Sequence, residues 1–330
     1  TMSGKIVTVF GASGFLGRQV VRSLCRDGWR VRAAMRRPHL GGDLKLSGDV
    51  GQVQLFQANV RNRESVKRAL KGADAAINLV AVLYERGSQT FSAVQAEGAK
   101  NVAEMAAEAG ISDFTLVSAI GASRDARSNY GKAKGDAEAA TRAAIPTATI
   151  LRPSIIFGPE DGMFTRIAEM ARMTPVLPVI GGGSKIQPAY VGDVAAAVAA
   201  SLSNPDATAK TYELGGPRIY TMRELMQFTI DQIDRARLLV PLPWLIASPL
   251  GYTIGALSKL NPFFGPPLTG DQVQILRDDN IVADDALTFA DLGVTNLETI
   301  EAIAPTYLWR HRPYGQFHTS SVDEVSRVDA

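Results

Sequence analysis

Two side chains near the middle of the sequence are of types that transfer protons. Tyr130 and Lys134 stand four positions apart, so on a helix both fall on one face. An ammonium group beside a phenol favours the phenolate, and a further cation close by would add to this effect. The pKa of Tyr130 would then fall far enough for proton transfer at neutral pH. A Tyr-x-x-x-Lys pair is common by chance, so its meaning depends on the elements around it.

A glycine-rich loop near the start of the chain supplies that context. The segment Gly11–Gly17 follows a β-branched strand pattern and leads into a helical pattern. Gly11 allows a tight turn, Gly14 lets the backbone approach a pyrophosphate, and Gly17 lets the helix lie close to the sheet. The helix N-terminus offers unpaired N–H groups to the anion. A chance glycine turn is the alternative. We predict a dinucleotide site with loop contacts from Gly11, Ser13, Gly14, Phe15, Leu16 and Gly17. Lys134 would then hydrogen-bond the nicotinamide ribose, and the nicotinamide would be the further cation beside Tyr130.

The residues after the second predicted strand, Trp29–Met35, indicate which dinucleotide is bound. An NAD site carries an acid about 20 residues beyond the loop to bind the ribose 2′-hydroxyl, but residues 28–42 contain no acid. Arg36 and Arg37 stand there instead, and a guanidinium suits a 2′-phosphate. We predict NADP(H), with Arg18 as a further candidate for the same pocket. The alternative is that both arginines only lie in a solvated loop. Even then NAD is not preferred, because the acid that would bind its 2′-hydroxyl is missing.

Composition and charge exclude several classes of protein. Of 330 residues, 46% are apolar and 21% charged, as in ordinary globular proteins. The formal net charge is +2 and no run of like charges occurs, which argues against nucleic-acid binding. Cys25 is the single cysteine and fits a reducing compartment, while the three scattered histidines predict no metal site. Because the first strand begins almost at once, we expect no signal or transit peptide.

Strand and helix patterns alternate through the first half of the chain. This alternation predicts an α/β fold with a doubly wound parallel sheet of the NAD(P)-binding Rossmann type. After the second strand we predict strands at Val53–Val60, Asp74–Val82, Phe114–Val117 and Ala148–Phe157, and helices at Arg63–Leu70, Phe91–Ala109 and Asn129–Ala144. A helix at Val191–Leu202 and a strand at Thr211–Leu214 should return to this sheet.

These elements predict two regions. Residues 1–158, completed by residues 187–215, should form a Rossmann NADP-binding core. Residues 159–186 and 216–330 should form a smaller C-terminal α/β region that docks on a partner or covers a substrate.

Several motifs together resemble the extended or atypical short-chain dehydrogenase/reductase superfamily over about residues 5–215. They are the glycine loop, Asn78–Ala81, Tyr130 with Lys134, Arg152–Pro159 and Gln187–Val194. Within the superfamily, Val117–Ala122, Leu268–Gly293 and the tail Tyr307–Tyr314 are most similar to one branch. This branch is the nucleotide-binding accessory subunits of respiratory complex I, the proton-pumping NADH:ubiquinone oxidoreductase.

The resemblance implies further contacts to the nucleotide. Val80 and Ala81 would line the cofactor, Asn59 would contact the adenine, and Pro153 would shape the wall beside the nicotinamide. Asn59 is equally well explained by turn chemistry. Arg152 would be either a structural ion-pair partner or a substrate ligand.

One departure from the superfamily bears on catalysis. Catalytic members place a serine just after the fifth strand, and here that position falls on Ala119 or Ile120, with Ser118 one or two residues early. Side chains alternate along a strand, so a slip of one residue turns Ser118 away from the site. Ser123 could substitute from the loop. Without the serine, Tyr130 and Lys134 would hold the cofactor rather than turn it over.

Two apolar segments bear on partners. Residues 241–267 carry an apolar stripe at helical spacing, which either faces a core or docks on a membrane or a partner subunit. The stripe is interrupted and shorter than the ~20 residues that span a bilayer. The tail 307–318 mixes aromatic and cationic residues, as membrane interfaces and binding hot spots do, although a solvated tail is the alternative. We predict peripheral membrane contact through both segments.

The combined reading is an NADP(H)-binding accessory subunit of complex I without turnover of its own, which stabilises the assembly and contacts other complex I subunits. We expect it at the cytoplasmic face of a bacterial inner membrane, or at the matrix side of the mitochondrial inner membrane if the chain is a processed eukaryotic one. The alternative is a soluble NADP-dependent reductase or epimerase of the extended short-chain dehydrogenase type. A cofactor-sensing regulator has less support.

Overall fold

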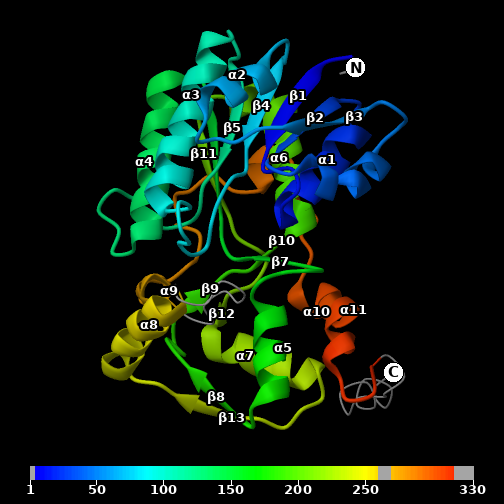
Figure 1. The fold of residues 1–330 in the computed structure, drawn as a ribbon. Coiled ribbons are helices and arrows are strands. Elements are labelled where there is room, and N and C mark those ends of the chain that lie inside the picture. Colours follow the sequence, from blue (N-terminus) through cyan, green and yellow to red (C-terminus); the bar gives the residue numbers. More distant parts are fainter. Residues whose placement is uncertain (1–3, 259–268, 316–330) are drawn as a thin grey trace. The chain divides into compact units, whose positions relative to one another are not determined.

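The chain divides into two compact units, whose elements Figure 1 labels. The computed structural model describes residues 4–258 and 269–315. The first unit comprises residues 1–153, 191–214 and 282–295, and the second comprises residues 154–190, 215–281 and 296–330.

The first unit is built on a seven-stranded sheet. Its strands, in spatial order, are β11 (Thr211–Leu214), β6 (Thr149–Pro153), β5 (Asp113–Val117), β4 (Ala75–Asn78), β1 (Ile6–Phe10), β2 (Arg30–Met35) and β3 (Val53–Gln57). Every neighbouring pair is parallel. The strand order reverses between β1 and β4, which is where doubly wound sheets bind their ligands. The predicted fold class is confirmed.

Helices cover both faces of this sheet (Figure 1). On one side α1 (Phe15–Arg26) packs against α6 (Val191–Ser203). On the other side α3 (Glu97–Glu108) packs between α2 (Arg63–Leu70) and α4 (Asn129–Ala144). Apolar residues at helical spacing explain the packing, since Val20 and Leu24 of α1 are fully buried. Short 3₁₀ helices lie at Pro38–Leu40 (η1), Gly42–Ser47 (η2), Pro205–Ala207 (η4) and Ala290–Leu292 (η5).

The predicted helices and strands agree with the structure more closely in their interiors than at their ends. Two strands end earlier than predicted: β3 stops at Gln57 rather than Val60, and β4 stops at Asn78 rather than Val82. The Asn78 side chain accepts the Val80 N–H at 3.1 Å, and this turn ends β4. The predicted helix Phe91–Ala109 opens with a π-helix, η3 (Ser92–Ala96), before α3 begins.

The predicted strand Ala148–Phe157 is two strands, of which the second belongs to the second unit. There β7 (Ile156–Phe157) pairs with β10 (Ala189–Tyr190), and β9 (Lys185–Ile186) pairs with β12 (Tyr220–Thr221). A third pair is parallel, β8 (Val176–Val179) with β13 (Leu238–Pro241). The remaining elements are α5 (Phe164–Met173), α7 (Met222–Gln232), α8 (Trp244–Ser258), α9 (Gly270–Ile275), α10 (Ile300–Ile303), α11 (Pro305–Leu308) and η6 (Trp309–His311).

The core of the second unit joins α5 and α7 to the C-terminal helices. Ile300, Tyr307 and Leu308 are buried in the same apolar cluster as Phe164 and Leu225. A buried polar contact strengthens the junction, because the Tyr307 hydroxyl donates to Asp161 Oδ2 at 2.5 Å. Tyr307 and Leu308 of the tail are therefore core residues, whereas Arg310 and Tyr314 are exposed.

Several segments differ from the predicted division of the chain. Residues 154–158, 187–190 and 215 were assigned to the Rossmann core, but they belong to the second unit. Residues 282–295 were assigned to the C-terminal region, but they belong to the first unit. The Glu213 N–H donates to Leu287 O at 2.8 Å, and the Ala283 N–H donates to Glu213 Oε2 at 3.0 Å. The segment thus runs along β11 and covers an otherwise open sheet edge, a pairing that local patterns do not reveal.

Candidate nucleotide-binding site

The glycine loop has the geometry that its spacing predicts. Gly11 has φ +86°, and its N–H donates to Ala34 O at 3.1 Å. A Cβ on Gly17 would lie 2.7 Å from the carbonyl carbon of Ala12, so only glycine lets α1 approach the loop this closely. The Gly14 N–H donates to Gly11 O at 3.0 Å and closes the turn.

The N-terminus of α1 is free to bind an anion. Gly14 is its N-cap residue, no side chain caps it, and no acid lies in its first turn. Its first N–H groups lack helical acceptors, and the helix dipole places partial positive charge there. Ser13 and Gly14 are exposed, while Phe15 and Leu16 are half-buried. These features suit a pyrophosphate.

The loop lies where the strand order reverses. Phe10, the last residue of β1, is in register with Asn78, the last residue of β4, and the Leu79 N–H donates to Phe10 O at 3.0 Å. A Cβ on Gly11 would lie 3.3 Å from the Val80 nitrogen. Val80 is half-buried beside the loop and Ala81 is exposed. The structure therefore brings the β4 segment to the glycine loop.

The arginines expected at the 2′-phosphate lie just beyond β2. Arg36 and Arg37 are exposed, and the Arg36 guanidinium donates to the Gln89 side chain. Arg18 forms an ion pair with Asp43. Gln89 belongs to the segment after β4, so Arg36 connects two of the strands that border the site. No local sequence pattern points to Gln89, because its contact with Arg36 spans 53 residues.

Tyr130 and Lys134 lie on α4, as predicted. The Tyr130 ring packs edge-on against Phe91, with centroids 5.9 Å apart. Lys134 is buried, its Nζ donates to Val117 O at 3.0 Å, and this nitrogen lies 5.9 Å from the Tyr130 ring centroid.

The pKa values of this pair differ from the expectation. Burial raises the pKa of Tyr130 to about 12, whereas the lowered value was predicted for the pair with the cationic nicotinamide beside it. Burial also lowers the pKa of Lys134 to about 8, against an opposing effect of Glu138. Desolvation exceeds the influence of the ammonium, which is bonded to a carbonyl oxygen rather than directed at the phenol. Burial among the chain's own residues thus favours the neutral phenol of Tyr130.

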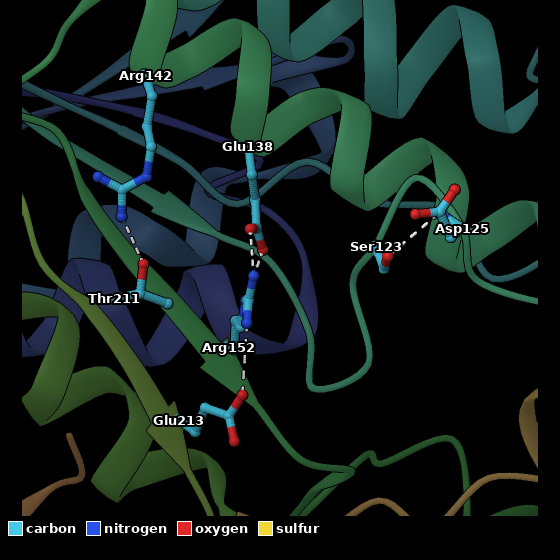
Figure 2. A network of polar contacts seen from close by, with 7 residues as sticks. All are labelled: Ser123, Asp125, Glu138, Arg142, Arg152, Thr211 and Glu213. Carbon is cyan, nitrogen blue, oxygen red and sulfur yellow. Dashed lines mark hydrogen bonds and ion pairs between the residues drawn. The ribbon is translucent and has the colours of Figure 1, made fainter. Parts of the chain in front are cut away.

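Neither candidate serine completes a catalytic set. Ser118 is 3% exposed, and its hydroxyl has no hydrogen-bond partner in the described parts of the chain. It is therefore not bonded to Tyr130 or Lys134. Ser123 is exposed, and its hydroxyl accepts the Asp125 N–H at 3.1 Å (Figure 2).

Of the remaining predicted residues, one lies at the end of a strand of the sheet and two have structural roles. Pro153 is buried at the end of β6, and its carbonyl accepts the Ile120 N–H at 3.1 Å. Asn59 accepts the Arg61 N–H at 3.2 Å, which supports turn chemistry for it. Arg152 is an ion-pair partner, bonded to Glu138 at 2.7 Å and Glu213 at 3.5 Å (Figure 2).

In residues 4–258 and 269–315, no group of three or more His, Cys, Asp or Glu side chains has the arrangement to hold a metal ion. Over the same residues, no helix combines the length and apolar character needed to cross a bilayer.

The sheet order, the glycine loop and the open helix end define the class of protein, a Rossmann-type nucleotide-binding protein. Residues 11–205 match the NAD(P)H-binding family, and the chain belongs to this family. More particularly, it belongs with the NADH dehydrogenase (ubiquinone) 1 alpha subcomplex subunit 9 proteins. It is 36% identical over 336 residues to the mitochondrial protein of that name from Arabidopsis thaliana, with 100% of this chain and 83% of the relative covered. The counterpart from Rattus norvegicus is 32% identical, with 98% and 85% covered.

Two further similarities concern a different kind of relative. A ceramide reductase from Caulobacter vibrioides is 34% identical, with 72% of this chain and 74% of that protein covered. The solved structure of an NADPH-dependent quinone oxidoreductase from Escherichia coli, in complex with NADPH, superposes with a TM-score of 0.71 at 20% identity. It covers 92% of this chain and 99% of that one, which shows the shared fold.

Proposed function

We propose that this chain is an NADP(H)-binding accessory subunit of complex I that does not turn over the nucleotide itself. The observation that carries the proposal is the similarity to the Arabidopsis subunit, which covers 100% of this chain. It therefore includes the second unit, which nucleotide binding by a Rossmann sheet does not require.

The residues present fit a dinucleotide. The first unit offers a cradle that a Cβ at Gly17 would fill and a helix end with free N–H groups. Gly11, Ser13 and Gly14 would hold the pyrophosphate, and Lys134 would hold the nicotinamide ribose, with Val80, Ala81 and Pro153 beside it. When bound, the nicotinamide can supply a hydride. A ligand that binds only the folded state stabilises it by about 2.7 kcal/mol at a hundredfold excess over Kd.

NADP(H) is favoured over NAD(H) by the charges around β2. Residues 28–42 contain no acid to bind a 2′-hydroxyl. Arg36 and Arg37 are exposed there and available to a 2′-phosphate, whose contact with a guanidinium is charge-assisted.

A role without turnover is supported by the groups around Tyr130. Burial holds the pKa of its phenol at about 12, and the Ser118 hydroxyl is not bonded to it. A reductase with this arrangement would lack both a ready proton donor and an oriented donor to the developing oxyanion.

We also propose that the subunit binds other complex I subunits and lies peripherally at the membrane, on its cytoplasmic or matrix side. Exposed apolar side chains in the second unit support this placement. Leu245 and Ile246 of α8 are 90% and 54% exposed. The tail contributes less than its composition suggested, because Tyr307, Leu308 and His311 are buried. Residues 259–267 and 316–318, also predicted to take part, lie outside the described residues.

Purification from native membranes tests the proposal. A tagged chain extracted with mild detergent should co-migrate with an assembly that contains flavin and iron–sulfur clusters. NADPH should be released, unreacted, when that assembly is denatured. A chain that migrates alone, free of the assembly, would contradict the subunit assignment.

The reductase alternative has narrower support. The likeness to ceramide reductase covers 72% of this chain, against 100% for the complex I subunit. Mixing the purified protein with NADPH and a panel of carbonyl compounds tests it directly. Turnover that disappears in Tyr130→Phe would overturn the proposal of an inert site.

A further inference from the structure

Three charged residues in the first unit form a connected chain that ends one helical turn from Lys134. Glu138 is on α4, and Arg152 Nε and Nη2 donate to its two carboxylate oxygens at 2.9 and 2.7 Å. The third guanidinium nitrogen, Nη1, lies 3.5 Å from Glu213 Oε1 (Figure 2). One edge of the guanidinium, Nε and Nη2, binds both carboxylate oxygens of Glu138, and this bidentate contact fixes the orientation of Glu138.

Lys134 needs an anion near it. Its side chain is 3% exposed, and the bond that it makes to Val117 is to a neutral carbonyl oxygen. A buried ammonium without a nearby negative charge releases its proton readily. Glu138, four residues further along α4 and itself 8% exposed, is positioned to supply that charge. Its electrostatic effect on the pKa of Lys134 has the expected upward direction.

We propose that Glu138, clamped by Arg152, is a positioning residue that keeps Lys134 protonated and thereby sets the pH range in which the site binds its anionic dinucleotide. This inference rests on the proposed nucleotide-binding role of the chain. Lys134 touches the nucleotide, whereas Glu138 acts through Lys134. Arg152 limits the stabilisation of protonated Lys134 by Glu138, because the positive charge of Arg152 partly neutralises the Glu138 carboxylate.

Other charged groups near α4 are directed elsewhere. The packed π-helix η3 carries no ionisable residue. On α3, Glu97 and Lys100 are exposed, and Glu104 and Glu108 pair with Arg63. Asp113 at the start of β5 is exposed as well. Tyr130 is the other titratable group facing Lys134, and burial keeps it neutral by raising its pKa to about 12.

The same helix offers a matched control. Arg142 lies one turn beyond Glu138, and it donates to Thr211 Oγ1 at 2.5 Å and to Ala209 O at 3.2 Å. It therefore ties α4 to β11, as the Glu138 network does (Figure 2). Arg142 is eight residues beyond Lys134, about two turns along the helix. If the Glu138 network only anchors α4, then Glu138→Gln and Arg142→Gln should behave alike.

The test is an NMR titration of Lys134 in protein that carries isotope-labelled lysine. The NMR signal of Lys134 is assigned by its loss in Lys134→Arg. The wild-type midpoint should lie near pH 8. Glu138→Gln should lower it by about one unit. Arg142→Gln should leave it unchanged, and Arg152→Gln should raise it, because Glu138 is then no longer neutralised. The affinity for NADPH at pH 7.5 should fall about threefold in Glu138→Gln, as the protonated fraction of Lys134 falls.

Because the NMR titration needs no nucleotide, it separates this inference from the proposed function. Shifts of opposite sign in Glu138→Gln and Arg152→Gln support the inference even if NADPH does not bind. An unchanged midpoint in Glu138→Gln, or an equal shift in Arg142→Gln, overturns it. If Arg152→Gln does not fold, the comparison of Glu138→Gln with Arg142→Gln still decides.

Discussion

At the scale of single residues, two basic groups in the first unit have contrasting surroundings. Arg36 is exposed and its guanidinium donates to the Gln89 side chain, so its contribution to binding depends on where that side chain lies. Lys134 is 3% exposed, and its charge depends on its neighbours. The two residues therefore require different tests.

Arg36→Asp should weaken NADPH binding. It removes a charge-assisted contact, worth about 1.5–3 kcal/mol, and places an acid beside the 2′-phosphate, so we expect at least a tenfold loss. NADH should be affected much less. Titration calorimetry with both nucleotides measures the difference. Arg22→Asp, which reverses an exposed charge on α1, is the matched control. Equal affinities of Arg36→Asp and wild type for NADPH would remove Arg36 from the site.

Lys134 should make folding stability depend on alkaline pH. Its pKa is about 8 in the folded protein, against 10.5 for an unperturbed lysine. Between these values the unfolded chain binds more protons, so stability rises with pH through this window. Below the pKa of the folded protein, the charged Lys134 side chain lowers the free energy of unfolding by its full amount. The size of the pKa shift limits this amount to at most about 3 kcal/mol. Urea unfolding of wild type and Lys134→Met should therefore differ most at pH 7 and converge near pH 10.5. Parallel pH profiles would show that the burial of Lys134 costs nothing.

At the scale of elements, local patterns predicted what depends on neighbours in sequence. The bounds of α2, α4 and β11 follow directly from periodicity and caps, such as Ser128, which accepts the Gly131 N–H at 3.0 Å. The early end of β4 depends on one side-chain turn at Asn78. The sequence does not indicate this turn, because the residues around Asn78 form a continuous apolar run. The pairing of Glu138 with Arg152 depends on how α4 packs over β6, so no spacing rule reveals it. For the same reason residues 282–295 were assigned to the wrong region.

The contact between α1 and the glycine loop should be intolerant of a single methyl group. Gly17→Ala raises helix propensity by about 1 kcal/mol, but its Cβ would meet backbone atoms of Gly11 and Ala12. Because backbone cannot yield as a side chain does, we expect net destabilisation of about 1–3 kcal/mol and loss of nucleotide binding. Gly42→Ala is the control, since a Cβ there meets nothing within 4 Å. Denaturant unfolding and NADPH titration measure both effects; a Gly17→Ala protein as stable as wild type would refute the close approach.

At the scale of the whole molecule, the second unit presents an apolar face. In the β8–β13 pair, Val176 is in register with Leu238, and both are exposed, at 44% and 62%. Their neighbours Leu177 and Leu239 are buried, so the two faces of this small sheet differ in exposure but not in polarity. Residues 235–258 carry two arginines and no acid. Exposed aliphatic side chains with cations near them suit an anionic bilayer surface.

Introducing charge on this face should therefore release the protein from lipid. Val176→Glu with Leu238→Glu should reduce co-sedimentation with vesicles that contain anionic phospholipid, because it removes apolar contact and adds repulsion. Ile219→Glu, at an exposed apolar site elsewhere in the same unit, should have little effect. Circular dichroism checks that both variants fold. Equal binding by the double variant and wild type would show that this face does not meet the membrane.

The bond between Tyr307 and Asp161 has a consequence for how the protein is made. A ribosome delivers the chain from its N-terminus, at about 5–20 residues per second. The second unit cannot close its core before Leu308 emerges, and the first unit must wait for residues 282–295 to cover β11. The first unit lacks this cover from the emergence of Leu214 until residues 282–295 follow, roughly 4–16 s of synthesis. A nascent chain would expose the open edge of β11 during that interval, so its yield in cells should depend on chaperones that shield such edges.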